Sequence, residues 1–484
     1  MGPYILAVLL ALAAVLVVAL VIAAVHAMRI KAPANTREPA DRATPEETQK
    51  YAETLAAMVQ IPTVSRRGEN DLTEFRRLQA VMREKFPHVF EKMELTDLDG
   101  NLLLRLPGKD PNRNGILLMG HQDVVPADGK DWKHDPFSGL IEDDVVFGRG
   151  AMDCKCTVMA EFQAMEELLA EGFEPPCDVY LSSSVNEEIS GGGVQKAVAY
   201  LKEKGIRLDL CMDEGGAIMN GMLPGMPVWA AAVGVQEKGY VDVKIKAKGN
   251  GGHSSTPPKN TPIARLSAFV TEVEKKRPFK AAFSPTVQAM FEGAAAYMTF
   301  PMRLLLGNLW LFGPLIKFLM PKVSSYAQAF LSTTFCFTMS GGSTAANVIP
   351  DEAYVVCNLR PSEHQNAEES IKVLKKYADK YDLECEVIIA RNASNCAKLD
   401  GEEFAYLKQC VDECYPDAGA LPYLMAGGTD CRQFEAVCDS CLRFCPIKMT
   451  QEQLAAMHAA NETIGVPELA ASVKFYKHFV KNHK

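Results

Sequence analysis

Four short, largely apolar runs along the chain each lead to residues that can bind a metal ion or transfer a proton. The runs cover residues 116–119, 179–185, 208–212 and 442–444. They lead to His121, to Glu187 and Glu188, to Asp213 and, after a polar segment, to His458. Short apolar runs bounded by turn residues are typical of buried strands. The pattern therefore predicts strands whose ends carry the reactive side chains.

Helical stretches separate the predicted strands, and Val158–Leu169 is one of them. Alternating strands and helices predict an α/β fold with a doubly wound, mostly parallel sheet. In such a sheet, ligands bind beyond the carboxyl ends of the strands. Because several residues of metal-binding type follow successive strands, we expect them to form one site.

The first segment of the chain has a different pattern. Tyr4–Val25 is an unbroken run without a charged residue, a Gly or a Pro. As a helix it would be about 33 Å long, enough to cross a bilayer core of about 30 Å. We therefore expect a single-pass membrane anchor within residues 1–30, followed by a linker at 31–45. A cleaved signal peptide is the alternative, but no Lys or Arg precedes the run, and it is longer than a usual signal-peptide core.

The basic residues near this run lie after it. They are Arg29, Lys31, Arg37 and Arg42, and the positive-inside rule then favours a cytoplasmic catalytic part. A second apolar segment, 297–320, is interrupted by Pro and by charged residues. This interruption predicts two short amphipathic helices rather than a second span. Packing in a core is the default expectation for them, and contact with an acyl group or a membrane stays open.

Length and composition set further bounds. At 484 residues the chain exceeds what one core usually organises, so two folded units are expected. A net charge of -9, without a basic stripe, argues against binding to nucleic acid. The fourteen cysteines are scattered, and many lie in apolar runs, which predicts buried reduced thiols. Those in apolar runs include Cys177, Cys211, Cys336 and Cys357. An iron–sulfur cluster at Cys438, Cys441 and Cys445 is disfavoured, because the spacing is loose for a four-thiolate site.

The motifs together resemble the aminoacylase/carboxypeptidase S family of di-zinc peptidases, in the carboxypeptidase S-like branch that includes N-fatty-acyl-amino-acid synthase/hydrolases. The resemblance covers nearly all of the chain after residue 50. The motifs that carry it are His121-Gln122-Asp123, Gly148–Asp153, Glu187-Glu188, Asp213, Gly252–Ser255, Ala346–Pro350, Asn358–Arg360, Gly427–Asp430 and His458. Each motif alone is weak, and their joint order and spacing make the signal specific.

The resemblance implies two divalent metal ions per chain. Asp153 would bridge them, His121 and Asp213 would complete one site, and Glu188 and His458 would complete the other. Nitrogen and oxygen ligands suit zinc, with cobalt or manganese as substitutes. Glu187 would be the general base, with Asp123 orienting the imidazole of His121. In relatives the peptide bond after the bridging aspartate is cis, which implies a cis bond between Asp153 and Cys154.

The resemblance also implies an inserted α+β lid that takes part in dimerisation. The expected division is a catalytic domain at 46–235 and 390–484, interrupted by the lid at 236–389. From the lid, His253 and Asn347 would hold the scissile carbonyl, and Arg360 would bind the substrate carboxylate. Gly428 and Arg432 would assist from the catalytic side. In dimeric relatives the histidine reaches in from the second subunit, so a homodimer is expected here.

The resulting hypothesis is a two-metal hydrolase of amide bonds next to a free carboxylate, a carboxypeptidase S-like enzyme for short peptides. An N-acyl-amino-acid amidohydrolase, reversible and acting on long acyl chains, is the alternative. A catalytically inactive, membrane-anchored binding protein is the alternative of another class. The intact set of expected ligands argues against it. The sequence does not identify the acyl group or the amino acid.

Overall fold

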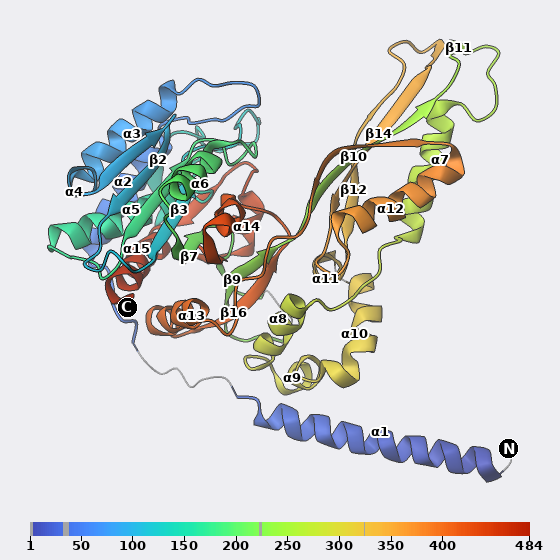
Figure 1. Cartoon of the computed structure of the whole chain (residues 1–484), viewed down its shortest axis with the longest axis horizontal. Coiled ribbons are helices and arrows are strands. Elements are labelled where there is room, and N and C mark those ends of the chain that lie inside the picture. The colour runs from blue at the N-terminus through green and yellow to red at the C-terminus, as the bar shows by residue number, and fades with distance from the viewer. Residues whose placement is uncertain (1–2, 32–37, 222–224, 324) are drawn as a thin grey trace.

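The computed structural model describes residues 3–31, 38–221, 225–323 and 325–484. Its largest element is a mixed sheet of ten strands (Figure 1). The strands, in spatial order, are β1 (Glu94–Leu98), β2 (Asn101–Leu106), β6 (Val179–Ser184), β3 (Gly115–His121), β7 (Leu208–Asp213), β17 (Cys438–Arg443), β9 (Trp229–Glu237), β8 (Ile218–Met219) and β18 (Lys448–Met449), with β16 (Ala418–Met425) beside β9. The central strands β6, β3, β7 and β17 run parallel, as the sequence predicts.

Both faces of this sheet are covered by helices. Alternate residues of β3 enter two cores: Ile116 and Leu118 face one, and Leu117 and Met119 face the other. The first core is closed by α2 (Pro45–Val59), α3 (Thr73–Lys85), α4 (Pro87–Lys92), α5 (Lys155–Ala170), α13 (Glu402–Cys414) and α15 (Val466–Asn482). The second is closed by α6 (Gly193–Glu203) and the short helix η2 (Asp430–Ala436). The doubly wound α/β prediction is therefore confirmed.

A smaller antiparallel sheet projects from the large one (Figure 1). Its strands are β12 (Thr334–Gly341), β14 (Glu352–Arg360), β10 (Tyr240–Lys248) and β15 (Glu384–Arg391), and α7 (Pro262–Lys276), α12 (Ala367–Ala378) and the short helix η1 (Asp379–Tyr381) pack with it. At its far tip, β11 (Gly252–His253) pairs with β13 (Val348–Ile349). Cys336 is exposed, contrary to expectation, because β12 is an edge strand. We keep the domain division at about 236 and 389 as a proposal.

A group of four helices lies within the predicted lid range but packs elsewhere. It comprises α8 (Pro285–Ala295), α9 (Phe300–Leu306), α10 (Leu309–Val323) and α11 (Ser325–Leu331). These helices form a third core with the outer strands of the large sheet, where Ala230 of β9 and Leu421 of β16 are buried. The apolar segment 297–320 thus contributes two short helices to a core, which is the default expectation.

The remaining elements are local. They are α1 (Pro3–Arg29), α14 (Gln451–Ala456) and a small sheet of β19 (Thr463–Gly465), β5 (Val145–Phe147) and β4 (Leu140–Glu142). In the described residues α1 is the one single helix long and apolar enough to cross a membrane, and a signal sequence would pass the same test. The loop between α14 and β19 carries His458, so this loop brings the last predicted ligand to the site.

Candidate metal centre

The candidate site lies where β3, β6 and β7 end. Asp153 is at its centre, on the turn that precedes α5. One oxygen, Oδ1, is 3.1 Å from Nε2 of His121, and the other, Oδ2, is 2.8 Å from Nε2 of His458. The peptide bond between Asp153 and Cys154 is cis, as the resemblance implies. A buried carboxylate that presents one oxygen to each of two imidazoles has the geometry of a bridging ligand.

Two groups of possible ligands share Asp153. The first contains His121, Asp153, Cys154 and Glu214, and the second contains Asp153, Glu188 and His458. Within each group the ligand atoms lie within 4.8 Å of one another. In the second group, Oε2 of Glu188 is 3.1 Å from Nε2 of His458, and its Oε1 is buried without a hydrogen-bond partner among the described residues. An unsatisfied buried carboxylate oxygen beside a second carboxylate fits a cation at this position.

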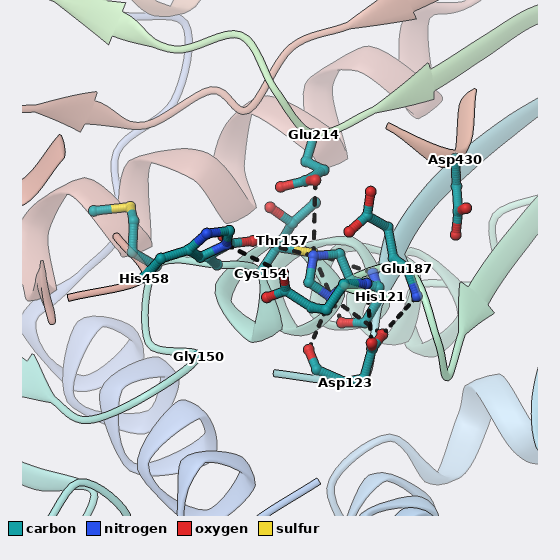
Figure 2. A network of polar contacts seen from close by, with 12 residues as sticks. His121, Asp123, Gly150, Cys154, Thr157, Glu187, Glu214, Asp430 and His458 are labelled. Atoms are coloured by element: carbon teal, nitrogen blue, oxygen red, sulfur yellow. Dashed lines mark hydrogen bonds and ion pairs between the residues drawn. The ribbon is translucent and has the colours of Figure 1, made fainter. Parts of the chain in front are cut away.

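The first group differs from expectation at one position. Asp213 faces away from the site: its Oδ1 accepts a hydrogen bond from the N–H of Glu214, and its Oδ2 accepts one from the N–H of Cys431. The adjacent Glu214 lies over His121, with its Oε1 3.7 Å from Nε2 (Figure 2). The chain turns sharply after Glu214, because Gly215 has a φ of +100°. Among the described residues, Glu214 and not Asp213 is grouped with His121 and Asp153.

Cys154 supports the first group from behind. Its Sγ is 3.1 Å from the backbone N of His121, which donates to it. Burial raises the pKa of the Cys154 thiol well above its usual range. The Sγ also lies 3.7 Å from the backbone oxygen of His121, so the thiol contacts both polar groups of the His121 backbone.

Asp123 connects the two halves of the site. The Nδ1 of His121 is 2.8 Å from the backbone oxygen of Asp123 and 3.5 Å from its Oδ1. The same carboxylate accepts hydrogen bonds from the N–H groups of Glu187 and Glu188 and from the hydroxyl of Ser65. Asp123 is fully buried. It therefore fixes the His121 ring and the loop that carries both glutamates at once.

Glu187 lies beside the two groups without belonging to either (Figure 2). Burial raises the pKa of its carboxyl well above the usual range, and the nearby carboxylates of Asp430 and Glu188 add to the rise against the effect of His121. Burial likewise raises the pKa of Asp430 to about 7, and Asp430 accepts a hydrogen bond from the Ser184 hydroxyl. A carboxyl with a raised pKa suits proton transfer near neutral pH.

Glu462 has a positioning role that the sequence reasoning missed. Its Oε1 accepts hydrogen bonds from the N–H groups of Gly150, Met152 and Asp153, and its Oε2 is paired with Arg149. Arg149 also donates to the backbone oxygen of Ala459. Glu462 is fully buried and lies four residues after His458. The sequence contained one indication of this role: Glu462 is an acidic residue in a segment rich in small and apolar residues, close to the predicted ligand His458.

A cleft of about 540 Å³ lies between the two sheets. Glu187, Glu188 and His458 line one side, and Arg360 lines the other. Gly428 and Arg432 also line the cleft, as predicted, and no described residue of α8–α11 lines it. His253 and Asn347 do not: both lie at the exposed tip formed by β11 and β13, where the N–H of Ser254 donates to the oxygen of Asn347 (Figure 1).

The fold and the site define a hydrolase of the dinuclear metallopeptidase class. The chain belongs to the peptidase family M20/M25/M40, whose model matches residues 117–482. It is 32% identical over 446 residues to the human N-fatty-acyl-amino acid synthase/hydrolase PM20D1, covering 90% of this chain and 88% of that protein. It is 27% identical to carboxypeptidase S of Saccharomyces cerevisiae, covering 89% and 83%.

Solved structures show the same fold. An M20 family metallo-carboxypeptidase from Sulfolobus solfataricus superposes with a TM-score of 0.65 at 19% identity, covering 89% of this chain and 98% of that one. Human carnosine dipeptidase 1 superposes with a TM-score of 0.63 at 15% identity, covering 90% and 97%. An M20 protein of Bacillus subtilis, described as a dinuclear metal-binding peptidase, also shares the fold, with a TM-score of 0.55. The predicted family and the enzyme class are confirmed.

Proposed function

We propose that this enzyme hydrolyses the amide bond next to a free carboxylate, as a carboxypeptidase S-like peptidase of short peptides. One observation supports this most strongly. Arg360 lines the same cleft as Glu187 and His458, and no carboxylate pairs with it in the part of the chain that the structure describes. Its guanidinium lies 4.6 Å from the centre of the Tyr240 ring. Asp242 lines the same cleft and acts on Arg360 electrostatically, without an ion pair between them in the described structure. A half-buried guanidinium without an ion-pair partner suits a substrate carboxylate, which it can bind with two parallel hydrogen bonds.

The ligand set proposed for the two ions follows the observed geometry. His121, Asp153 and Glu214 would hold one ion, and Asp153, Glu188 and His458 would hold the other. Zinc suits these ligands, and cobalt or manganese are alternatives. Two divalent ions bound there supply Lewis acidity and lower the pKa of water. Glu187 takes the proton from the attacking water and delivers it to the leaving nitrogen.

N-acyl amino acids are the second candidate substrate class. The identity of 32% to the human N-fatty-acyl-amino acid synthase/hydrolase favours it. An acyl amino acid presents the same amide beside the same free carboxylate, so Arg360 would bind either class. No described residue of α8–α11 lines the cleft, so these helices do not support the idea that they form an acyl-binding pocket there. An inactive binding protein is disfavoured, since Glu187 and both candidate ligand groups are intact.

Two further proposals concern assembly. The chain acts as a homodimer in which His253 and Asn347 reach the cleft of the partner subunit. Their position at the exposed tip of the small sheet, outside their own cleft, supports this. The chain is held to a membrane by α1, and the basic residues after α1 favour a cytoplasmic catalytic part.

The substrate proposal can be tested with zinc-loaded full-length enzyme in detergent or nanodiscs. A panel pairs each dipeptide and each N-acyl amino acid with its C-terminally amidated form. The wild type should prefer the free acids by about 10–100-fold or more, since hydrogen bonds to a charged group contribute about 1.5–3 kcal/mol. Arg360→Ala should remove this preference, and Arg360→Lys should restore little of it because an ammonium lacks the planar fork.

Arg391→Ala is the matched control, because Arg391 lines the same cleft. This variant should keep the preference for free acids. Equal hydrolysis of free and amidated substrates by the wild type would contradict the proposal and indicate an aminopeptidase. The ratio of acyl amino acids to dipeptides in the same panel decides between the two candidate substrate classes.

A further inference from the structure

Three arginines lie around one tyrosine ring on the Arg360 side of the cleft. The guanidinium of Arg360 lies 4.6 Å from the centre of the Tyr240 ring. Arg391 of β15 is the cross-strand partner of Tyr240, and directly opposite residues of an antiparallel pair project from the same face of a sheet. Arg67, which lies in the loop between α2 and α3, lines the same cleft. Segments far apart in the sequence therefore bring three guanidinium groups to one place.

The hydroxyl of Tyr240 is affected by charges from both parts of the molecule. Burial and the carboxylate of Asp242 raise the pKa of this hydroxyl, and Arg360 and Arg67 act against the rise. Electrostatic effects weaken with distance, so both guanidiniums lie near the ring. Arg67 thus reaches the group from the part that carries the large sheet, whereas Arg360 and Arg391 belong to the small sheet.

The other Arg and Lys side chains that the described structure places in the cleft are engaged within the chain. Nη1 of Arg432 lies 3.6 Å from Oε2 of Glu237. Nζ of Lys238 donates to two backbone oxygens near the end of α11. By contrast, the side chains of Arg67 and Arg391 have no hydrogen-bond or ion-pair partner among the described residues. Their charges are therefore free to bind an anion from outside the chain.

The acidic side chains of the cleft do not neutralise the three arginines. Glu188 is a candidate metal ligand, and Glu187 and Asp430 lie beside the candidate metal groups (Figure 2). Asp242 remains, and its Oδ1 accepts a hydrogen bond from Asn358. Three guanidiniums and one carboxylate leave a surplus of positive charge, which is unfavourable because like charges repel. The α-carboxylate proposed to bind Arg360 removes only part of this surplus, so a second anionic group is expected.

We propose that the enzyme selects substrates whose C-terminal residue carries a second carboxylate, as glutamate and aspartate do. Arg360 binds the α-carboxylate, and Arg391 and Arg67 bind the carboxylate of the side chain. The scissile amide faces Glu187, so the Arg360 side of the cleft receives the residue that follows this amide. Guanidinium groups bind carboxylates through paired, charge-assisted hydrogen bonds. The inference rests on the proposed function and adds to it the class of residue that is released.

Matched substrates test this preference in zinc-loaded full-length enzyme in detergent. Alanyl-glutamate is compared with alanyl-glutamine, and N-acetyl-glutamate with N-acetyl-glutamine, because each pair differs in one charge and little in size. The wild type should have a kcat/KM about tenfold higher for the acid of each pair, as expected for hydrogen bonds to a charged group. Arg391→Ala and Arg67→Ala should each lower this ratio, and the double variant should bring it to about one, mainly through KM.

Arg66→Ala is the matched control. Arg66 is next to Arg67, but it pairs with Asp128 and does not line the cleft, so this variant should keep the wild-type ratio. Reversed dipeptides give a second control: glutamyl-alanine and glutaminyl-alanine should be cleaved at similar rates, because their acidic side chain lies on the other side of the amide. Arg391→Ala should still prefer free over amidated C-termini, because Arg360 is intact.

The outcomes separate this inference from the proposed function. If no substrate with a free α-carboxylate is hydrolysed, both proposals fail. If the amides are hydrolysed as fast as the acids by the wild type, selection of a second carboxylate is wrong and the proposed function stands. A preference for the acids that survives in the double variant, or that Arg66→Ala removes equally, would also contradict the role of Arg67 and Arg391. Equal preference for glutamate on the N-terminal side of the amide would contradict the placement of the side chain.

Discussion

Glu214 and Asp213 are neighbours with different environments, and this difference is the basis for proposing Glu214 as the metal ligand. Asp213 accepts two backbone hydrogen bonds, which hold the loop after β7 against η2. Glu214 has its carboxylate near Nε2 of His121 and is grouped with Asp153. A carboxylate whose oxygens already accept two backbone hydrogen bonds has less capacity left for a cation.

We predict that Glu214→Gln and Asp213→Asn have distinct effects. Glu214→Gln should lose about one of the two ions per chain and lower the rate by orders of magnitude, because an amide is a weak ligand. Asp213→Asn should keep both ions and lose about 1–3 kcal/mol of stability, because one buried N–H loses its acceptor. Elemental analysis and thermal unfolding measure both quantities. Loss of an ion from a folded Asp213→Asn enzyme would restore Asp213 to the ligand set.

At this scale the sequence indicates which kinds of residue gather at the site, but it does not decide between two acidic neighbours. His121, Asp153, Glu188 and His458 lie together in the groups that could hold metal ions. The choice between Asp213 and Glu214 depends on where the strand stops and the chain turns at Gly215. Strand alternation applies only within the strand, so adjacent acidic residues at its end cannot be distinguished by spacing.

At the scale of elements, the site depends on a connection between two segments far apart in the sequence. The turn at 148–153 carries Asp153, and the loop at 457–462 carries His458. Glu462 binds three N–H groups of that turn and the guanidinium of Arg149, so it fixes the distance between two ligands. Residues that orient ligands in this way contribute substantially to metal affinity, although they do not touch the ion.

Replacing Glu462 should therefore weaken metal binding without touching a ligand. We predict that Glu462→Gln lowers metal affinity about 10–100-fold, as is typical of residues that orient ligands. Competition with a chelator measures this affinity. Glu161→Gln is the matched control, since Glu161 is a buried carboxylate on α5 that belongs to neither candidate ligand group. If Glu462→Gln unfolds more easily but binds metal as tightly as the wild type, Glu462 has only a structural role.

The element scale also shows what the sequence could not predict. The strands and the helix at 158–169 were found because each is an apolar run that is buried along almost its whole length. The packing of α8–α11 against β9 and β16 joins residues far apart in the sequence, and apolar periodicity does not specify the partner of a helix. The contact between Asn308 and α1 could not be predicted from the sequence for the same reason.

At the scale of the whole molecule, one chain does not bring all predicted site residues together. The cleft contains Arg360, Gly428 and Arg432 with Glu187, and the described tip of the small sheet carries His253 and Asn347 in solvent. A symmetric dimer exchanges equivalent surfaces between its subunits, so the tip of each could enter the cleft of the other. The resemblance implies this arrangement.

Mixing two inactive variants tests the dimer directly. His253→Ala and Glu187→Gln should each be inactive alone, because one lacks the residue donated to the partner and the other lacks the base. When equal amounts are mixed and allowed to exchange subunits, half of the dimers are mixed and each has one complete site. Activity should then recover to about a quarter of the wild-type value per chain. Different affinity tags on the two variants measure how many mixed dimers form.

The control mixture combines Glu187→Gln with Arg360→Ala. These two residues line the same cleft of one chain, so a mixed dimer still has one defect in each site and should stay inactive. Recovery in the first mixture and not in the second therefore requires that His253 acts across the subunit boundary. If mixed dimers form and neither mixture recovers activity, His253 serves its own subunit after a closing movement of the small sheet. Activity of His253→Ala alone at the wild-type level would remove His253 from the site altogether.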